Sequence, residues 1–132
     1  MKAEVRYLSK SGNTKAVAEA IAAAAGCKAE TIEMPVNEQT DILFIGGALY
    51  WGGIDKALKA YIASLTPSNV KQVAVFSTAS IKESAYPQIS GALEKQGLSV
   101  LKAEFHCKGK VAKTEETSVL IKKFTEEVMA SL

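Results

Sequence analysis

Residues 9–14 read Ser9-Lys10-Ser11-Gly12-Asn13-Thr14, a short polar loop between an apolar run and a segment with helical spacing. The apolar run covers residues 5–8, and the alanine-rich helical segment covers residues 15–25. A strand that enters a helix through a tight loop leaves the first N–H groups of the helix unpaired, and the helix dipole favours an anion there. The hydroxyl and amide side chains add donors, and Gly12 lets the backbone approach a ligand closely. The sequence therefore predicts a binding site for a phosphate monoester.

A simpler interpretation of the same loop is a Gly-Asn turn followed by a Ser or Thr helix cap. A cap needs one hydroxyl, whereas this loop offers several, so the anion site is favoured. The loop also resembles the phosphate-binding loop of flavodoxins, which reads Ser/Thr-x-Ser/Thr-Gly-Asn-Thr after the first strand, and every defining position matches. The resemblance implies FMN as the cofactor, with all residues of this loop around its phosphate.

Length and composition predict one folded domain over residues 1–132, because 48% of the residues are apolar and 23% are charged. The sequence lacks the run of about 20 apolar residues that a membrane helix needs, and its first apolar run is too short for a secretory signal. We therefore expect a cytoplasmic protein without membrane contact. The net charge of +2, without a Lys/Arg cluster, gives no sign of nucleic acid as a partner.

The two cysteines and the one histidine indicate no catalytic or metal site. Cys27 and Cys107 lack ligand spacing and are expected to be free thiols. His106 is expected near a strand end at the surface rather than as a catalytic base.

Apolar runs of strand length recur at residues 3–8, 29–32, 41–46, 72–77 and 98–105, with helical segments between most of them. The third and fourth runs do not alternate, which is typical of strands covered on both faces. These features predict a doubly wound α/β sheet of five parallel strands. The flavodoxin order 2-1-3-4-5 then places the ligand at the carboxyl edge, between the first and third strands.

The helical segments differ in how regular they are. Residues 33–40 are too few for a crossover helix and contain Pro35, so the second helix is expected to be shortened or missing. In the last helix, Thr114 is expected to be the N-cap. The predicted buried positions of that helix are Leu120, Phe124 and Val128.

A second loop follows the third strand, which is expected to end at Gly46-Gly47. It reads Ala48-Leu49-Tyr50-Trp51-Gly52-Gly53 and contains the only Trp of the chain. An aromatic pair contributes roughly 0.5–1.5 kcal/mol beyond burial, and the glycines would let the backbone approach a ring edge. The alternative is a core aromatic pair that covers the sheet. The stretch resembles the corresponding loop of flavodiiron proteins and menaquinone-linked protoporphyrinogen oxidases, which implies that Tyr50 or Trp51 stacks on the flavin.

The fourth strand is expected to end at Ser77, and the residues after it form a third loop. The resemblance to flavodoxins implies backbone contacts from Thr78, Ala79 and Ser80 to the flavin ring. Tyr86 is either a second stacking residue or, as we favour, a packing residue at the start of a helix.

Other phosphate-handling proteins of this topology are excluded by their motifs. A dinucleotide fold needs GxGxxG, a low-molecular-weight phosphatase needs a cysteine in the first loop, and a receiver domain needs an aspartate where Gly46-Gly47 stands. We therefore expect a monomeric FMN protein that carries electrons between redox partner proteins, more a one-electron carrier than a turnover enzyme. The alternatives are a small NAD(P)H:quinone reductase and a flavodoxin-like binding module without a cofactor.

The charge near the loops bears on the reduction potential. Asp55 and Glu83 are the carboxylates close to the expected site, and Lys82 lies beside them in the sequence. Because negative charge near a flavin disfavours its reduction, this slightly basic chain is predicted to have a less negative potential than an acidic flavodoxin.

Overall fold

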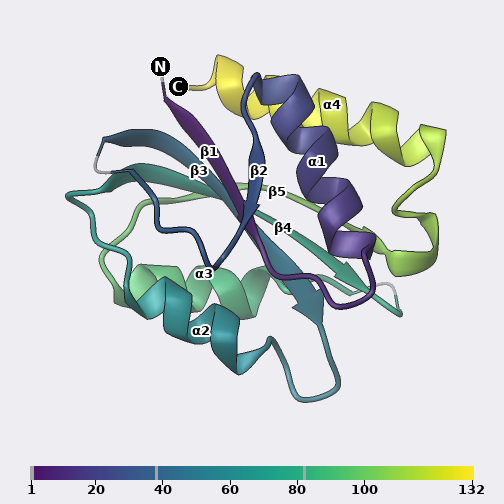
Figure 1. Cartoon of the computed structure of the whole chain (residues 1–132), viewed down its shortest axis with the longest axis horizontal. Coiled ribbons are helices and arrows are strands. Elements are labelled where there is room, and N and C mark those ends of the chain that lie inside the picture. The colour runs from purple at the N-terminus through teal and green to yellow at the C-terminus, as the bar shows by residue number, and fades with distance from the viewer. Residues whose placement is uncertain (1, 38, 82) are drawn as a thin grey trace.

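The computed structural model describes residues 2–37, 39–81 and 83–132 and contains one five-stranded parallel sheet (Figure 1). The elements in chain order are β1 (Ala3–Tyr7), α1 (Asn13–Ala25), β2 (Ala29–Thr31), β3 (Thr40–Leu49), α2 (Lys56–Ala63), β4 (Val70–Ala79), α3 (Tyr86–Lys95), β5 (Val100–Lys108), the 3-10 helix η1 (Gly109–Val111) and α4 (Glu115–Ala130). The strand order β2-β1-β3-β4-β5 confirms the predicted doubly wound topology.

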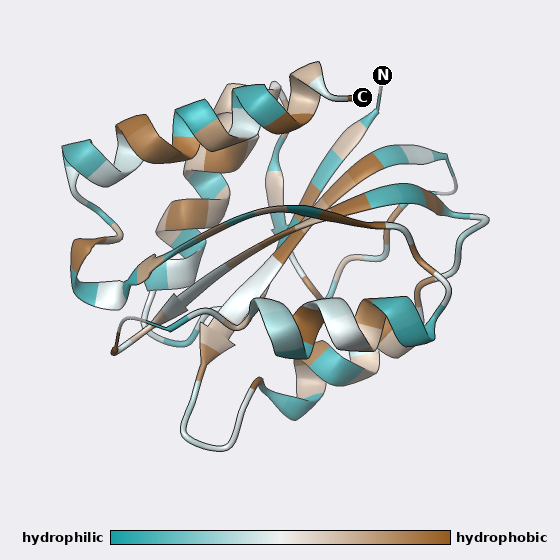
Figure 2. Cartoon of the chain, turned by 180° about the vertical axis from the view of Figure 1, so that it is seen from behind, coloured by the Kyte–Doolittle hydropathy of each residue, from teal (hydrophilic) through white to brown (hydrophobic). Residues whose placement is uncertain are grey.

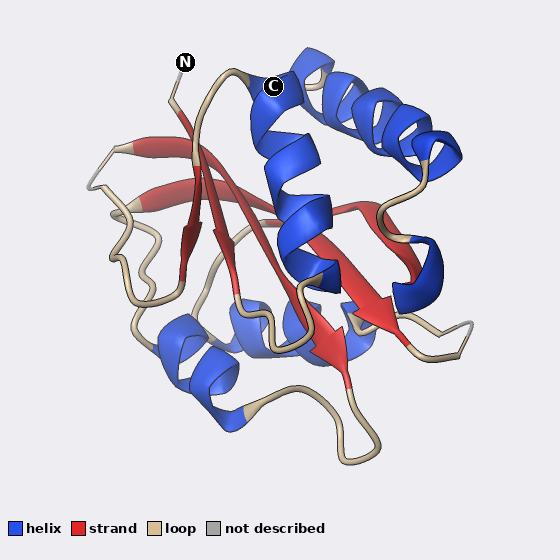
Figure 3. Cartoon of the chain, turned by 45° about the vertical axis from the view of Figure 1, so that its right-hand side comes forward, coloured by secondary structure: helices blue, strands red, loops and turns tan. Residues whose placement is uncertain are grey.

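Helices cover both faces of the sheet, with α1 and α4 on one side and α2 and α3 on the other (Figures 1 and 3). Phe44 of β3 faces the first pair, and its ring centroid lies 6.1 Å from that of Phe124 in α4. The next residue, Ile45, points to the opposite face and belongs to the same buried cluster as Leu58 of α2. Successive residues of β3 therefore serve different cores, which explains its unbroken apolar run and the hydrophobic colours along the central strands in Figure 2.

A buried ion pair, rather than a helix, holds the link between β2 and β3. Arg6 Nη2 lies 2.7 Å from Glu4 Oε1, and the guanidinium also donates to the carbonyls of Met34 and Pro35. Glu4 accepts from the backbone N–H of Asn37 at 2.8 Å. The described residues of this link form turns and irregular backbone, which confirms the prediction that the second crossover helix is shortened or missing.

Strands β3 and β4 both extend further than the sequence analysis predicted. β3 runs past Gly46 to Leu49, and β4 runs past Ser77 to Ala79. These extensions pair with each other, since Leu49 and Ala79 are partners in the parallel register. Residues 48–49 and 78–79, which were expected in loops, therefore lie on paired strands of the sheet.

Close packing explains the glycines inside β3. A Cβ on Gly46 would lie 2.3 Å from the carbonyl oxygen of Phe76, and one on Gly47 would lie 2.7 Å from Leu58 Cδ2. The pair Gly46-Gly47 is therefore required by packing inside the protein, whereas the space beside Gly52 and Gly53 is open.

The buried face of α4 differs from the prediction at one position. Leu120 is 57% exposed, whereas Ile121 is 1% exposed and packs in the core with Phe124 and Val128. The prediction used a strict four-residue spacing, which drifts around the helix; the buried face also uses the three-residue step from Ile121 to Phe124. Thr114 is confirmed as the N-cap, since its side chain accepts from the N–H of Thr117.

Candidate functional site

A cleft of about 880 Å³ lies at the carboxyl edge of the sheet. This is the edge at which the flavodoxin order places a ligand. Its lining residues are Ser11, Asn13, Ala48, Leu49, Tyr50, Trp51, Thr78, Ala79, Ser80, Ile81, Glu83, Gly109 and Lys110. All three loops singled out from the sequence contribute, and the segment after β5 adds a fourth wall.

The start of α1 is open toward this cleft. Gly12 has φ +90°, which favours glycine, and no side chain of the described residues caps the helix. By contrast, Asp55 caps α2 and Thr114 caps α4. The Ser9 hydroxyl accepts from the N–H of Gly12 at 3.1 Å, so this side chain shapes the loop rather than capping the helix. The first N–H groups of α1 are therefore available to an anion.

Thr14 connects the first loop to the fourth strand. Its buried hydroxyl lies 2.8 Å from the hydroxyl of Thr78, which is also buried. Thr14 therefore lies behind the cleft and fixes the position of the first turn of α1 relative to β4.

The second loop is a tight turn at the tip of β3. The N–H of Tyr50 donates to the carbonyl of Gly53 at 2.8 Å, and the N–H of Gly53 donates back at 2.9 Å. Trp51 and Gly52 occupy the tip of the turn, and the Trp51 side chain is fully exposed. Tyr50 is 38% exposed. The alternative of a core aromatic pair is therefore wrong: both rings line the cleft instead.

Lys10 joins the first loop to the second. Its Nζ lies 3.0 Å from Asp55 Oδ2 and 5.1 Å from the centroid of the Tyr50 ring. The hydrogen bond and charge of Asp55 raise the pKa of Lys10, and the N–H of Ala57 together with Lys10 lowers the pKa of Asp55. The Asp55 carboxylate is thus matched by a cation beside the cleft.

In the third loop, Tyr86 does not line the cleft, whereas Ile81 does. The Tyr86 hydroxyl donates to the carbonyl of Leu101 at 2.7 Å, which confirms its packing role and removes it as a stacking residue. Ile81 and Glu83 line the cleft, and the sequence analysis had placed only Glu83 near the site. Lys82, the residue before Glu83 in the sequence, lies outside the described residues.

The wall formed by Gly109 and Lys110 was not predicted from the sequence. A Cβ on Gly109 would lie 2.6 Å from Asn13 Nδ2, so this glycine packs directly against the first loop. All strands of a parallel sheet end at the same edge, and this rule could have placed the end of β5 at the site. The strand was expected to end at residue 105 but runs to Lys108, which hid the connection.

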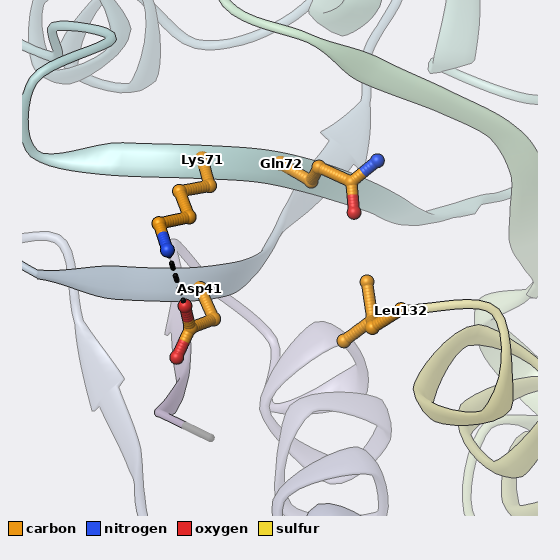
Figure 4. A pocket seen from close by; sticks show the side chains of 4 residues that line it. All are labelled: Asp41, Lys71, Gln72 and Leu132. Carbon is orange, nitrogen blue, oxygen red and sulfur yellow. Dashed lines mark ion pairs between the residues drawn. The ribbon is translucent and has the colours of Figure 1, made fainter.

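A hollow of about 410 Å³ at the opposite edge of the sheet offers no comparable chemistry (Figure 4). Lys71 Nζ lies 3.3 Å from Asp41 Oδ1, and the backbone N–H of Lys2 also donates to this carboxylate. Its charged groups therefore satisfy one another, and Gln72 and Leu132 complete the lining.

The structure supports neither a metal centre nor a reactive thiol in the described residues. No group of His, Cys, Asp and Glu side chains there is arranged to hold a metal ion. Cys27 and Cys107 are free, as predicted, and burial raises the pKa of both thiols. A raised pKa lowers the thiolate fraction, so neither residue is an activated nucleophile.

Comparison with known proteins places this chain in one family. The sequence pattern of the flavodoxin domain matches residues 4–129. The chain belongs to the flavodoxin domain family. No curated protein matches it in sequence. In the described part of this flavodoxin domain, no helix is both long and apolar enough to cross a membrane.

Solved structures share the fold, over nearly the whole length of two flavodoxins and over part of a larger protein. A flavodoxin from the domain Archaea is 20% identical, with a TM-score of 0.70 and coverage of 99% of this chain and 98% of that chain. Flavodoxin 1 from Bacillus cereus is 19% identical, with a TM-score of 0.79 and coverage of 100% and 99%. The rubredoxin oxygen:oxidoreductase from Desulfovibrio gigas is 16% identical, with a TM-score of 0.72, and the match covers 95% of this chain but 34% of that one.

Family membership implies FMN as the cofactor, and the residues of the cleft fit that molecule. An uncapped helix start suits a phosphate monoester, and neighbouring exposed aromatic rings suit a flat conjugated ring system. The wall of β4 adds the backbone of Thr78 and Ala79 at the same opening. The polar and aromatic halves of the cleft thus match the two chemically different ends of FMN.

Proposed function

We propose that this flavodoxin domain binds FMN in the cleft and carries electrons between redox partner proteins. The proposal rests on one observation above all: the uncapped start of α1 opens to the same cleft as Tyr50 and Trp51. Bound FMN supplies the redox chemistry, and the protein positions it and sets its potential. Cytoplasmic location and a monomeric state stay predictions from the sequence.

The residues divide by the part of FMN that they would hold. The first loop would hold the phosphate end of FMN, and its residues Ser11 and Asn13 line the cleft. The other residues of this loop determine its shape: Ser9, Lys10, Gly12 and Thr14. Tyr50 or Trp51 would stack on one side of the flavin ring. Backbone groups of Ala48, Leu49, Gly52, Thr78, Ala79 and Ser80 would surround the ring edge.

A carrier explains the cleft better than a turnover enzyme does. Among the cleft residues that the structure describes, the ionisable side chains are Tyr50, Glu83 and Lys110. Both Glu83 and Lys110 are exposed, and within the described part of the chain no ion pair or side-chain hydrogen bond holds either of them in place for proton transfer. The site therefore offers groups that bind and tune a cofactor, not an acid–base pair.

The direct test is a titration of the purified protein with FMN, followed by flavin absorbance and by the fluorescence of Trp51. We expect a stable yellow complex and quenching of the Trp51 emission, because this side chain lines the cleft. Ser11→Asp should abolish binding by placing a negative charge beside the phosphate. Ser99→Asp, an exposed position just before β5, adds the same charge away from the cleft and should bind normally.

Two results would defeat the proposal. Failure of the wild-type protein to bind FMN would leave a flavodoxin-like module without a cofactor. Rapid steady-state turnover of NADH with a quinone, without any added reductase, would instead identify the quinone reductase alternative.

A further inference from the structure

The segment that follows β5 brings a lysine next to the open start of α1. A Cβ built on Gly12 would lie 3.8 Å from Lys113 Nζ, so this ammonium group lies beside the first loop. The contact of Gly109 with Asn13 fixes the same segment against the loop four residues earlier. The packing of residue 109 therefore holds the backbone of this segment, and with it Lys113, beside the first loop.

Lys113 is not neutralised by a carboxylate in the described structure. The ion pairs found there join Arg6 to Glu4, Lys10 to Asp55, Lys71 to Asp41 and His106 to Glu104. Glu115 and Glu116, close in sequence, lie in the first turn of α4, where they complement the helix dipole. The ammonium of Lys113 thus lies beside the first loop, next to the uncapped start of α1, and both the ammonium and the free N–H groups there attract an anion.

We propose that Lys113 binds the phosphate of the cofactor and makes the site selective for a phosphorylated flavin over riboflavin. This inference rests on the proposed function, since it assigns a ligand group to the same cleft. A phosphate monoester carries a charge of about −1.5 to −2 near neutral pH, more than the partial charge of a helix start balances. A lysine on a flexible stem supplies the remaining charge without needing a fixed geometry.

The proposal predicts that the affinity for FMN depends on ionic strength and that the affinity for riboflavin does not. Salt screens an exposed ammonium–phosphate pair, because the Debye length falls from about 30 Å at 0.01 M salt to about 3 Å at 1 M. Lys113→Gln should weaken FMN binding about threefold to tenfold at low salt and flatten its salt dependence. Riboflavin affinity should stay within about twofold of the wild-type value, since riboflavin has no phosphate.

Two further variants separate charge from structure. Lys113→Arg keeps the charge and should retain tight FMN binding. Lys123→Gln removes the same charge from an exposed position further along α4 and should leave both flavins unaffected. Equal losses for FMN and riboflavin in Lys113→Gln would show that the lysine acts through folding, and no loss for either would show that it is not a ligand. Both results would overturn the proposal.

A measurement without flavin distinguishes this inference from the proposed function. Inorganic phosphate added to the cofactor-free protein should shift the NMR signals of the Gly12, Asn13 and Thr14 amides, and Lys113→Gln should reduce its affinity. If these shifts depend on Lys113 while FMN fails to bind, the anion role stands and the flavin assignment falls. If phosphate binds equally to wild type and variant, the role of Lys113 is refuted even where FMN binds.

Discussion

The hydroxyls of Thr14 and Thr78 lie 2.8 Å apart and join the first turn of α1 to the carboxyl end of β4. Thr14 is 2% exposed and Thr78 is 3% exposed, so water cannot replace either partner freely. The bond fixes the first loop relative to the wall of the cleft that β4 forms. A single buried contact thereby couples the stability of the fold to the shape of the site.

Replacing one of these threonines should cost more than replacing both. Thr78→Val leaves the Thr14 hydroxyl buried without its partner, and we expect a loss of about 1–3 kcal/mol in the free energy of unfolding. Thr14→Val should behave in the same way. The double variant should lose less than the sum of the two, because no unpaired hydroxyl is left. Urea denaturation of the four proteins without cofactor measures this coupling, and strictly additive losses would show that the bond contributes nothing.

Gly46 and Gly91 should respond in opposite directions to substitution by alanine. A Cβ on Gly46 would overlap the backbone oxygen of Phe76, and a backbone atom cannot move aside as a side chain can. Gly46→Ala should therefore destabilise the protein by at least about 1–3 kcal/mol. Gly91 lies inside α3 with nothing within 4 Å of such a Cβ, so Gly91→Ala should stabilise by about 0.5–1 kcal/mol. Thermal unfolding of both variants checks the signs, and a neutral Gly46→Ala would contradict the packing role.

These glycines also show where sequence reasoning reached its limit. The first loop could be interpreted correctly because its neighbours along the chain, a strand and a helix, define its local geometry. The role of Gly46 depends on Phe76, thirty positions away on another strand, and no local pattern reveals that contact. The same is true of Arg6 and Glu4, which look like ordinary charges in the sequence but are buried against residues 34–37.

The residues of the cleft could likewise be predicted only where the neighbouring sequence defines their position. Residues that come directly after β1 and β3 were placed at the cleft from chain order and the edge rule. Lys110 was not predicted at the cleft, although residues 108–113 could be read in the sequence. The reason is that β5 was expected to end at residue 105, whereas it runs to Lys108. Burial on a helix also depends on its partners: Leu120 and Ile121 are equally apolar, and only packing against α1 and the sheet decides between them.

Glu4 should make the stability of the protein depend on pH in the acidic range. Burial alone would raise the pKa of Glu4, but hydrogen bonds from Thr40 and Asn37 and the charge of Arg6 hold it below its ordinary value of 4.5. A carboxyl with a lowered pKa stabilises the fold at pH values above 4.5, and this contribution is lost as the pH falls through the lower value of the folded state.

The variant that tests this is Glu4→Gln, which leaves the buried Arg6 without a counter-charge. At pH 7 it should unfold with a free energy about 3–5 kcal/mol lower than that of the wild type. The difference should shrink as the pH falls below 4.5, because the wild-type carboxyl is then protonated first in the unfolded state and, below its lowered pKa, in the folded state as well. Glu33→Gln, at an exposed position in the same link, is the control and should show no such convergence. A gap that stays constant with pH would contradict the assignment.

The reduction potential of the bound flavin should respond to Glu83. Lys10 forms an ion pair with Asp55, and Glu83 is the carboxylate among the described residues that line the cleft. We therefore keep the prediction of a less negative potential than in an acidic flavodoxin. Glu83→Gln should raise the potential further, by roughly a few tens of millivolts for one charge near the ring. Glu94→Gln, on the exposed side of α3, should not change it. A redox titration giving equal potentials for wild type and Glu83→Gln would remove Glu83 from the site.

Tyr50, rather than Trp51, should carry the stacking contact with the flavin. The backbone of Tyr50 is fixed by two hydrogen bonds to Gly53, and Lys10 Nζ lies 5.1 Å from its ring centroid. Trp51 stands fully exposed at the tip of the turn, so ordering its side chain on binding costs conformational entropy that Tyr50 has already lost on folding.

Alanine variants of the two residues decide between them. Tyr50→Ala should weaken FMN and riboflavin binding alike, by about tenfold for a lost contact of roughly 0.5–1.5 kcal/mol plus the buried area of the ring. Tyr50→Phe keeps the ring and should bind nearly as well as the wild type. Trp51→Ala should bind FMN with a smaller loss, which flavin fluorescence can follow because this variant lacks the only Trp of the chain. A larger loss for Trp51→Ala than for Tyr50→Ala would transfer the stacking role to Trp51 at the tip of the turn.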